Sequence, residues 1–160
     1  MQTVTIICEG KLKEKYLRDA CAEYSKRLSA YCKLNVVELN PHRISENPSA
    51  AEIDSVLQAE SVEILSKIPS NAKVYAMCIE GKQMPSEKLA EEIAGCAVRG
   101  FSNIVFIIGG SHGLSDAVKK RADFRLSMSE MTFPHQLARV MLLEQIYRAY
   151  QISNGGKYHK

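Results

Sequence analysis

A run of mostly branched apolar residues that enters a glycine turn constrains the fold of this chain more than any other feature. Residues 103–108 read Asn-Ile-Val-Phe-Ile-Ile, and residues 109–113 follow as Gly-Gly-Ser-His-Gly. An apolar run without polar alternation is typical of a strand buried on both faces, as in parallel sheets covered by helices. Paired glycines let the backbone approach a ligand closely. We therefore expect an α/β fold with a ligand site where this strand ends.

Strand-like and helix-like segments alternate along the rest of the chain. Apolar β-branched runs predict strands, and apolar residues at helical spacing predict helices. This alternation predicts a mostly parallel sheet with helices on both faces. The expected strands are 2–8, 34–39, 73–80, 103–108 and 123–128, and the expected helices are 12–31, 49–67, 86–98, 114–121 and 134–152.

Length and composition favour an ordinary globular protein. The chain has 160 residues, which fits one domain spanning residues 1–160. No apolar run is long enough to cross a bilayer and no signal peptide is evident, so we expect a cytoplasmic protein without a membrane partner. The five cysteines are scattered and lack CxxC spacing. We therefore expect neither a disulfide framework nor a metal site.

Charge is distributed unevenly along the chain. Residues 1–43 carry a net charge of +3, residues 44–118 a net charge of −5, and residues 119–160 a net charge of +5. Basic ends of this kind could meet a phosphate backbone, but lysine and arginine also serve solubility. Charge alone leaves both interpretations open.

The last helix, expected over residues 134–152, is apolar around nearly its whole circumference. Such a helix must be buried on more than one side, either at a homodimer interface or as a central core helix. Three charged residues interrupt it, namely Arg139, Glu144 and Arg148. They could form a structural ion pair, since Glu144 and Arg148 are four residues apart, or an arginine could point towards phosphate.

Two segments are candidates for chemistry. The glycine turn is not a GxGxxG motif and lacks the lysine of a phosphate-binding loop, so it does not favour a nucleotide-phosphate site. The chain ends in Tyr158, His159 and Lys160, which together supply an aromatic ring, an imidazole and a cation. Such a tail could stack on a base, move a proton and hold a phosphate. The alternative for residues so close to a terminus is disorder.

Five sequence blocks in order resemble one known family. The family is that of the SPOUT-class (α/β-knot) methyltransferases that modify N3 of a pseudouridine in 23S rRNA, the ribosomal large subunit methyltransferase H family. The resemblance covers essentially the whole chain. The blocks are residues 10–16, 106–114, 131–136, 144–149 and 158–160.

The resemblance implies a C-terminal trefoil knot that holds S-adenosylmethionine in a bent shape. It also implies a homodimer whose substrate is the loop of helix 69 in assembled ribosomes, with 70S particles expected. Gly155 and Gly156 make the tail linker flexible, so we expect the tail to become ordered on RNA. Carried over by position, the cofactor contacts are Met77, Gly109, Met128, Ser129, Glu130, Met131, Thr132 and Phe133.

The resemblance also suggests roles for the charged and aromatic residues near the C-terminus. His159 is expected to act as the base or to orient it, and Tyr158 to stack on the substrate or donate a hydrogen bond. Arg139, Arg148 and Lys160 are expected to hold phosphates. Two alternatives stay open: a knotted methyltransferase that acts on tRNA, and a dimeric RNA-binding module without turnover.

Overall fold

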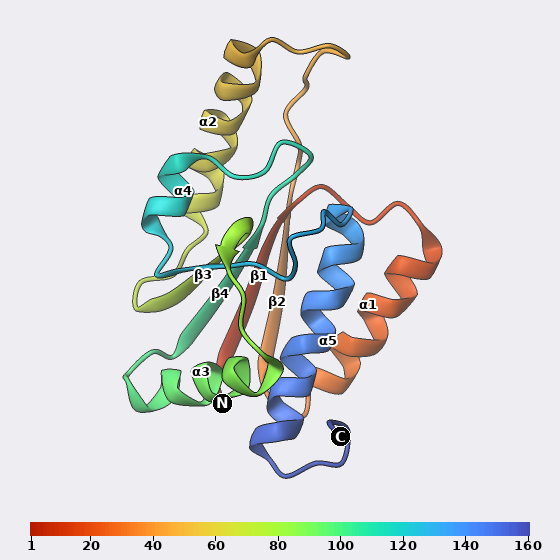
Figure 1. Cartoon of the computed structure of the whole chain (residues 1–160), viewed down its shortest axis with the longest axis vertical. Coiled ribbons are helices and arrows are strands. Elements are labelled where there is room, and N and C mark those ends of the chain that lie inside the picture. Colours follow the sequence, from red (N-terminus) through yellow and green to blue (C-terminus); the bar gives the residue numbers. More distant parts are fainter.

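Five parallel strands form one sheet in the computed structural model, which describes all 160 residues (Figure 1). The strands are β1 (Thr3–Glu9), β2 (Lys33–Leu39), β3 (Ala72–Lys82), β4 (Asn103–Ile108) and β5 (Phe124–Leu126). Their order across the sheet is β2-β1-β4-β3-β5. Because every neighbouring pair is parallel, the carboxyl ends of all five strands lie at one edge of the sheet.

Helices cover both faces of this sheet. The helices are α1 (Lys15–Leu28), α2 (Ala50–Ser66), α3 (Ser86–Val98), α4 (Asp116–Arg121) and α5 (His135–Ser153). On one face α5 packs between α1 and α3, and on the other face α2 packs beside α4 (Figure 1). The predicted α/β architecture, with a parallel sheet between two helical layers, is therefore confirmed.

The central strand β4 connects the two halves of the core. Its side chains alternate between the faces of the sheet, as in any strand. Ile104 and Phe106 pack towards α3 and α5, whereas Val105 and Ile107 pack towards α2 and α4. The ring of Phe106 stacks on Tyr75, with 5.0 Å between ring centroids. The predicted burial of this strand on both faces is therefore confirmed.

The first helix is shorter than the sequence predicts. The apolar spacing continues from residue 12 to 31, but α1 covers only Lys15–Leu28. A side chain further along the helix holds the preceding segment in a loop: Arg18 Nη1 donates hydrogen bonds to the carbonyl oxygens of Lys13 (2.7 Å) and Leu12 (3.3 Å). Periodicity alone could not detect this competing arrangement.

The short strand β5 lies in close contact with the end of β3. The amide of Ser127 donates a hydrogen bond of 2.9 Å to the carbonyl of Lys82. A Cβ atom added at Gly81 would lie 2.5 Å from the carbonyl oxygen of Arg125. Real Cβ atoms are not found this close to backbone, so only glycine allows the two chain segments to pass each other here. The strand expected over residues 123–128 is limited to three residues by this crossing.

Helix α5 is buried on the side that faces the sheet but is not enclosed all round within the single chain. Leu142, Leu143 and Ile146 are fully buried against the sheet, but Val140 and Met141 remain partly exposed. These two side chains line a groove of about 500 Å³ between α5, α1 and the segment that joins β3 to α3. The outer apolar side of α5 is therefore not covered by this chain.

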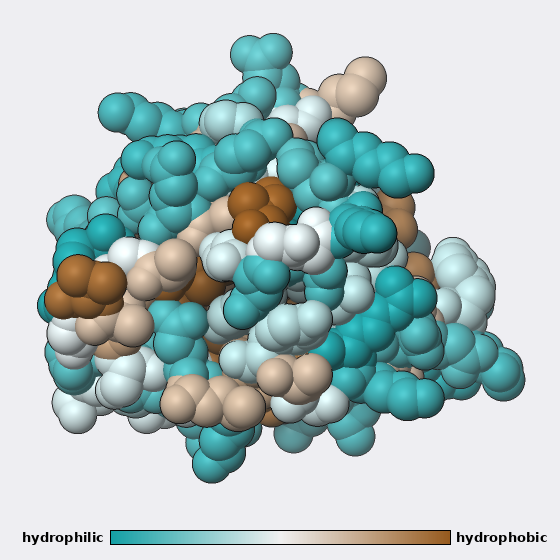
Figure 2. All heavy atoms as spheres, turned by 90° about the horizontal axis from the view of Figure 1, so that it is seen from below, coloured by the Kyte–Doolittle hydropathy of each residue, from teal (hydrophilic) through white to brown (hydrophobic).

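The opposite end of the sheet, at the amino ends of the strands, presents a largely polar surface. Apolar side chains form separate small groups there rather than a continuous patch (Figure 2). None of the helices is both long enough and apolar enough to span a membrane.

Candidate functional site

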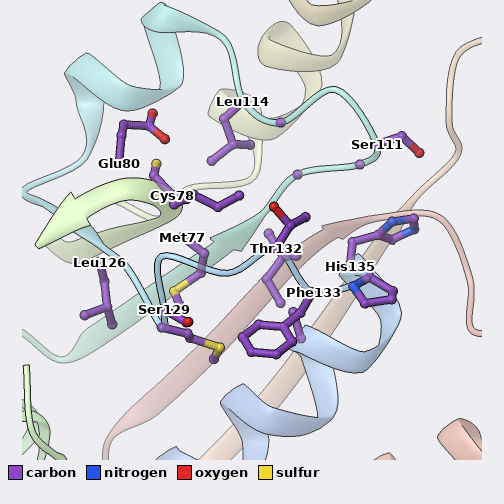
Figure 3. Close-up of a pocket in the computed structure, with 18 of the residues that line it drawn as sticks. Met77, Cys78, Glu80, Ser111, Leu114, Leu126, Ser129, Thr132, Phe133 and His135 are labelled. Atoms are coloured by element: carbon purple, nitrogen blue, oxygen red, sulfur yellow. The ribbon is translucent and has the colours of Figure 1, made fainter. Parts of the chain in front are cut away.

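A cavity of about 660 Å³ opens at the carboxyl edge of the sheet (Figure 3). We call it the carboxyl-edge cavity. Its walls come from the ends of β3 and β4, the glycine turn, the segment that joins β5 to α5, and the first turn of α5. A crevice at this edge of a parallel sheet is the usual place for a ligand. The site predicted from the glycine turn therefore coincides with a cavity.

Seven of the eight positions expected to contact S-adenosylmethionine line this cavity. They come from three separate parts of the chain, which the fold brings together. They are Met77, Gly109, Met128, Ser129, Met131, Thr132 and Phe133. The eighth, Glu130, is exposed and does not line the cavity.

Apolar side chains form one side of the carboxyl-edge cavity. Met77 and Leu126 approach it from neighbouring strands, and Phe133 closes it near the start of α5 (Figure 3). Leu114 contributes from the segment after the glycine turn. An enclosure of this kind suits a flat aromatic ring system, because ligand sites combine apolar walls with a few polar groups.

The glycine turn forms a second wall, and its shape depends on the lack of side chains. The amide of Gly113 donates a hydrogen bond of 3.1 Å to the carbonyl of Gly110. A Cβ atom at Gly109 would lie 2.7 Å from the carbonyl carbon of Gly113. Gly113 itself has a φ of 78°, in the left-handed region that favours glycine. Backbone amides and carbonyls are therefore directly accessible along this wall.

Serine side chains shape the segment between β5 and α5. Ser127 Oγ donates a hydrogen bond of 2.9 Å to the carbonyl of Ser129. Ser129 Oγ in turn accepts a hydrogen bond of 2.9 Å from the amide of Met131. Local bonds of this type stabilise turns instead of regular structure. They hold the segment in an irregular path along the cavity.

The charged groups at the carboxyl-edge cavity are few. Lys119 Nζ binds Glu80 Oε1 at 2.6 Å, and the hydrogen bond from this lysine lowers the pKa of Glu80. His135 lies at the other end, beside Phe133 (Figure 3). Burial, followed by the positive charges of Arg139 and Lys13, lowers the pKa of His135. Both effects favour the neutral form of the His135 imidazole.

The C-terminal tail packs on its own chain, away from the carboxyl-edge cavity. The ring of Tyr158 lies edge-on to Tyr147, with 4.8 Å between centroids, and 4.7 Å from the Arg148 guanidinium carbon. Burial raises the pKa of Tyr158 to about 12. The tail was expected to become ordered only on RNA, but aromatic and cation–π contacts already hold it on α5.

Both ring nitrogens of His159 are engaged in this position. Arg148 Nη1 donates a hydrogen bond to Nδ1 at 3.0 Å, and Nε2 donates one to Glu87 Oε1 at 2.7 Å. Arg148 also donates from Nε to Glu144 Oε1 at 2.8 Å. This pattern fits a neutral imidazole with its proton on Nε2. Glu144 and Arg148 therefore form an ion pair, as in the structural interpretation of these two residues.

Arg139 occupies a buried position that differs from its expected role at a phosphate. The side chain is 3% exposed, and Nη1 binds Glu38 Oε2 at 2.6 Å. Nη2 donates a hydrogen bond of 2.9 Å to the carbonyl of Gly10. A guanidinium enclosed in this way is not available to a phosphate on the surface. We therefore assign Arg139 a structural role, the attachment of the loop after β1 to α5.

A buried carboxyl group, that of Glu9, lies beneath the glycine turn and was not predicted from the sequence. Glu9 is 3% exposed, and neither of its carboxylate oxygens accepts a hydrogen bond from a donor. Burial, then the nearby carboxyl groups of Glu60 and Glu63 on α2, raise the pKa of Glu9 to about 8. A Cβ atom at Gly110 would lie 3.6 Å from the Cβ of Glu9. The available signal was an acidic residue at the end of a mostly apolar, β-branched strand.

No group of three or more histidine, cysteine, aspartate or glutamate side chains is arranged to hold a metal ion. Besides backbone groups and the charged side chains at its two ends, the site offers a ligand the hydroxyls of Ser111, Ser129 and Thr132. This set suits an organic molecule with hydrogen-bonding edges.

Comparison with known proteins agrees with this architecture. A solved structure described as a probable methylase family protein from Haemophilus influenzae Rd KW20 superimposes with a TM-score of 0.54 at 12% sequence identity. The match covers 98% of this chain and 70% of the other. At this identity the likeness shows the fold alone.

Curated relatives are much closer in sequence. The chain is 55% identical over 157 residues to ribosomal RNA large subunit methyltransferase H of Clostridium botulinum (strain Alaska E43 / Type E3), and 53% identical over 157 residues to that of Clostridioides difficile (strain 630). Both matches cover 98% of this chain and 99% of the relative. The family model described as "Predicted SPOUT methyltransferase" matches residues 1–159. The chain belongs to the SPOUT methyltransferase family.

Proposed function

We propose that this protein transfers a methyl group from S-adenosylmethionine to N3 of a pseudouridine in helix 69 of 23S rRNA. The observation that carries the proposal is the carboxyl-edge cavity. Seven of the eight positions expected to contact S-adenosylmethionine line it, although they come from three separate parts of the chain. The relatives named ribosomal RNA large subunit methyltransferase H support the choice of substrate. A substrate in the ribosome implies that the protein works in the cytoplasm.

The carboxyl-edge cavity fits S-adenosylmethionine in size and chemistry. Its volume of about 660 Å³ is within the range of sites for ligands of this size. Met77, Leu126 and Phe133 would enclose the adenine, and the exposed backbone around Gly109 would bind polar edges of the nucleoside. When bound, the cofactor supplies an electrophilic methyl group. The remaining chemistry falls to the chain's own residues.

The same residues support a trefoil knot around the cofactor. In this proposal residues 127–134 thread through a loop of the chain before α5 begins. Two observations support it: the contact of Gly81 with the backbone of Arg125, and the hydrogen bond between Ser127 and Lys82. Close passage of backbone segments is what a tight knot requires. The knot would hold the irregular cofactor-binding segment in a fixed shape.

Transfer to N3 requires loss of a proton, because N3 of a uracil-like base carries hydrogen. We assign His159 as the base or as the group that orients it, and Tyr158 as the partner that stacks on the substrate or donates a hydrogen bond. Lys160 and Arg148 would hold phosphates near the tail. For His159 to accept a proton, Nδ1 must first be released from Arg148.

A homodimer accounts for the position of the tail. No tail residue lines the carboxyl-edge cavity of its own chain. The partly exposed side of α5, with Val140 and Met141, offers an apolar surface to a second copy. In such a dimer the tail of one protomer would act at the cofactor of its partner. Both protomers would then contribute to one site.

The proposed function is tested by a radiolabelled methyl transfer assay. Purified 70S ribosomes, free 50S subunits and bulk tRNA are each incubated with the protein and labelled S-adenosylmethionine. We expect label in 23S rRNA, at the helix 69 pseudouridine, with 70S particles as the best substrate. Label in tRNA alone would overturn the choice of substrate. Cofactor binding by calorimetry without label in any RNA would favour a binding module without turnover.

Replacing His159 by alanine is expected to lower kcat on ribosomes by about 100-fold, the usual contribution of a positioned acid–base group. The affinity for S-adenosylmethionine is expected to stay unchanged, because no tail residue lines the cavity of its own chain and the role assigned to His159 is on the substrate proton. Lys157→Ala, in the same tail but exposed, is the matched control. A His159→Ala protein that methylates ribosomes at the wild-type rate would exclude the proposed role.

A further inference from the structure

The loop between β1 and α1 (residues 10–14) is attached directly to the start of α5. The amide of Lys13 donates a hydrogen bond of 2.9 Å to Gln136 Oε1, and Arg139 binds the carbonyl of Gly10. His135, on the first turn of α5, lines the carboxyl-edge cavity. The two segments therefore lie side by side at this edge of the molecule (Figure 1). The β1–α1 loop therefore lies next to the helix turn that forms one end of the carboxyl-edge cavity.

Two lysines of this loop are free of carboxylate partners. Lys11 and Lys13 are exposed, and neither forms an ion pair. Glu14 is the one acidic residue of the loop. Lys13 lies close enough to His135 for its charge to contribute to the lowered pKa of that histidine. The positive potential of the loop therefore reaches the edge of the carboxyl-edge cavity.

Arginine side chains hold the backbone of the loop in place by binding three of its carbonyl oxygens. Arg18 binds the carbonyls of Leu12 and Lys13, and Arg139 binds that of Gly10. A rigid backbone presents the two lysines at a fixed spacing. A partner that binds these cations therefore loses little free energy to ordering of the loop.

An exposed aromatic side chain follows the loop directly. Tyr16, on the first turn of α1, is 69% exposed. It is the only aromatic residue among the large apolar side chains that are exposed. The other tyrosines that form ring contacts pack against one another or against phenylalanine. A free ring beside unpaired cations is the combination that single-stranded RNA requires, with stacking for a base and charge for phosphates.

We propose that Lys11, Lys13 and Tyr16 form a docking surface for a single-stranded RNA loop beside the carboxyl-edge cavity. The lysines contact phosphates and the ring of Tyr16 stacks on an unpaired base. The surface rests on the proposed function, because it would present an RNA loop to the cavity. The tail of one protomer would act at the cofactor of its partner. The docking surface, in contrast, lies next to the cavity of its own chain.

The test is binding of purified 70S ribosomes, and of an RNA hairpin that carries the helix 69 loop, to a Lys11→Glu/Lys13→Glu double variant. We expect affinity for both to fall by at least roughly tenfold at moderate salt. Loss of two phosphate contacts is also expected to reduce the slope of log affinity against log salt by about 1.4. Affinity for S-adenosylmethionine should stay at the wild-type value. Tyr16→Ala should weaken RNA binding by roughly tenfold, and Tyr16→Phe should restore it.

The matched control is Lys26→Glu/Lys67→Glu, in which two exposed lysines at the opposite, amino-end side of the sheet are reversed. This variant has the same net charge as the test variant and should bind both RNAs as the wild type does. An equal loss of RNA affinity in the test variant and the control variant would overturn the proposal, because the loss would then follow from net charge alone. Loss of ribosome binding with unchanged hairpin binding would also overturn it, since the partner would then be a ribosomal protein. The charge-neutral Lys11→Gln/Lys13→Gln variant provides the same comparison if charge reversal prevents folding.

Measurements of RNA binding and of methyl transfer distinguish a failure of the docking surface from a failure of the proposed function. If wild-type protein transfers no methyl group to 23S rRNA but binds the hairpin through Lys11, Lys13 and Tyr16, the proposed function fails and the docking surface stands. If methyl transfer occurs at the wild-type rate in the double variant at limiting ribosome concentration, the surface fails and the proposed function stands.

Discussion

Replacement of Gly109 by alanine is expected to lower the affinity for S-adenosylmethionine by roughly 100-fold. The added Cβ would fall 2.7 Å from the carbonyl carbon of Gly113 and 3.1 Å from Leu114 Cδ2. The nearer atom belongs to the backbone, so the glycine turn itself must move. Overpacking of this kind costs up to about 3 kcal/mol, equivalent to about two orders of magnitude in binding. Calorimetric titration with the cofactor measures the effect.

The neighbouring glycine provides the control for this prediction. A Cβ at Gly110 would meet the Cβ of Glu9 at 3.6 Å, which is ordinary van der Waals contact. Gly110→Ala is therefore expected to bind the cofactor within a few-fold of the wild-type affinity. Equal binding by wild type and Gly109→Ala would mean that the turn is not a wall of the cofactor site.

The buried carboxyl group of Glu9 predicts that folding stability falls as pH rises through the neutral range. Glu9 has a pKa of about 8 in the folded chain, above the value of 4.5 expected when it is exposed. Between these two values the folded state binds more protons than the unfolded state, so the free energy of unfolding decreases with pH. The decrease begins near pH 4.5 and is complete above about pH 8, with a total of about 5 kcal/mol.

Glu9→Gln is expected to remove this dependence. Its amide cannot ionise and can donate a hydrogen bond to the carboxylate of Glu60. The variant should match the wild type near pH 5 and exceed its stability by about 4 kcal/mol at pH 8.5. Denaturant titrations at both pH values measure the difference. Glu91→Gln, on the exposed side of α3, should follow the wild-type profile. A wild-type stability that stays constant from pH 5 to 8.5 would show that the Glu9 carboxyl group is solvated.

Much of the fold could be predicted because its signals are local. The run at 103–108 is apolar on both faces, and this pattern identifies β4 as a central strand. Alternation of strands and helices predicts the parallel sheet. The start of α1 was harder to predict, since the Arg18 side chain binds the backbone of Leu12 and Lys13 and holds them outside the helix. A contact between a side chain and the backbone before its own helix has no periodic signature.

The candidate site was predictable to a smaller degree. The glycine turn indicated its location, but the family resemblance was needed to connect residues 128–133 with Met77. The burial of Arg139 could not be predicted, because it depends on Glu38, a strand residue 101 positions away along the chain. The same holds for Glu9 and Glu60, which are brought together only when α2 packs on the sheet. Long-range pairing of charged groups is set by tertiary packing.

The burial of all five cysteines has a practical consequence for experiments on the tail. Burial raises the pKa of Cys8 and Cys32 to about 11, and it also raises the pKa of Cys21, Cys78 and Cys96. Because the thiolate is the reactive species, the native protein should react slowly with maleimide dyes. A single cysteine introduced at exposed Lys157 would then carry the label almost alone. Its fluorescence would report directly when Tyr158 and His159 leave α5.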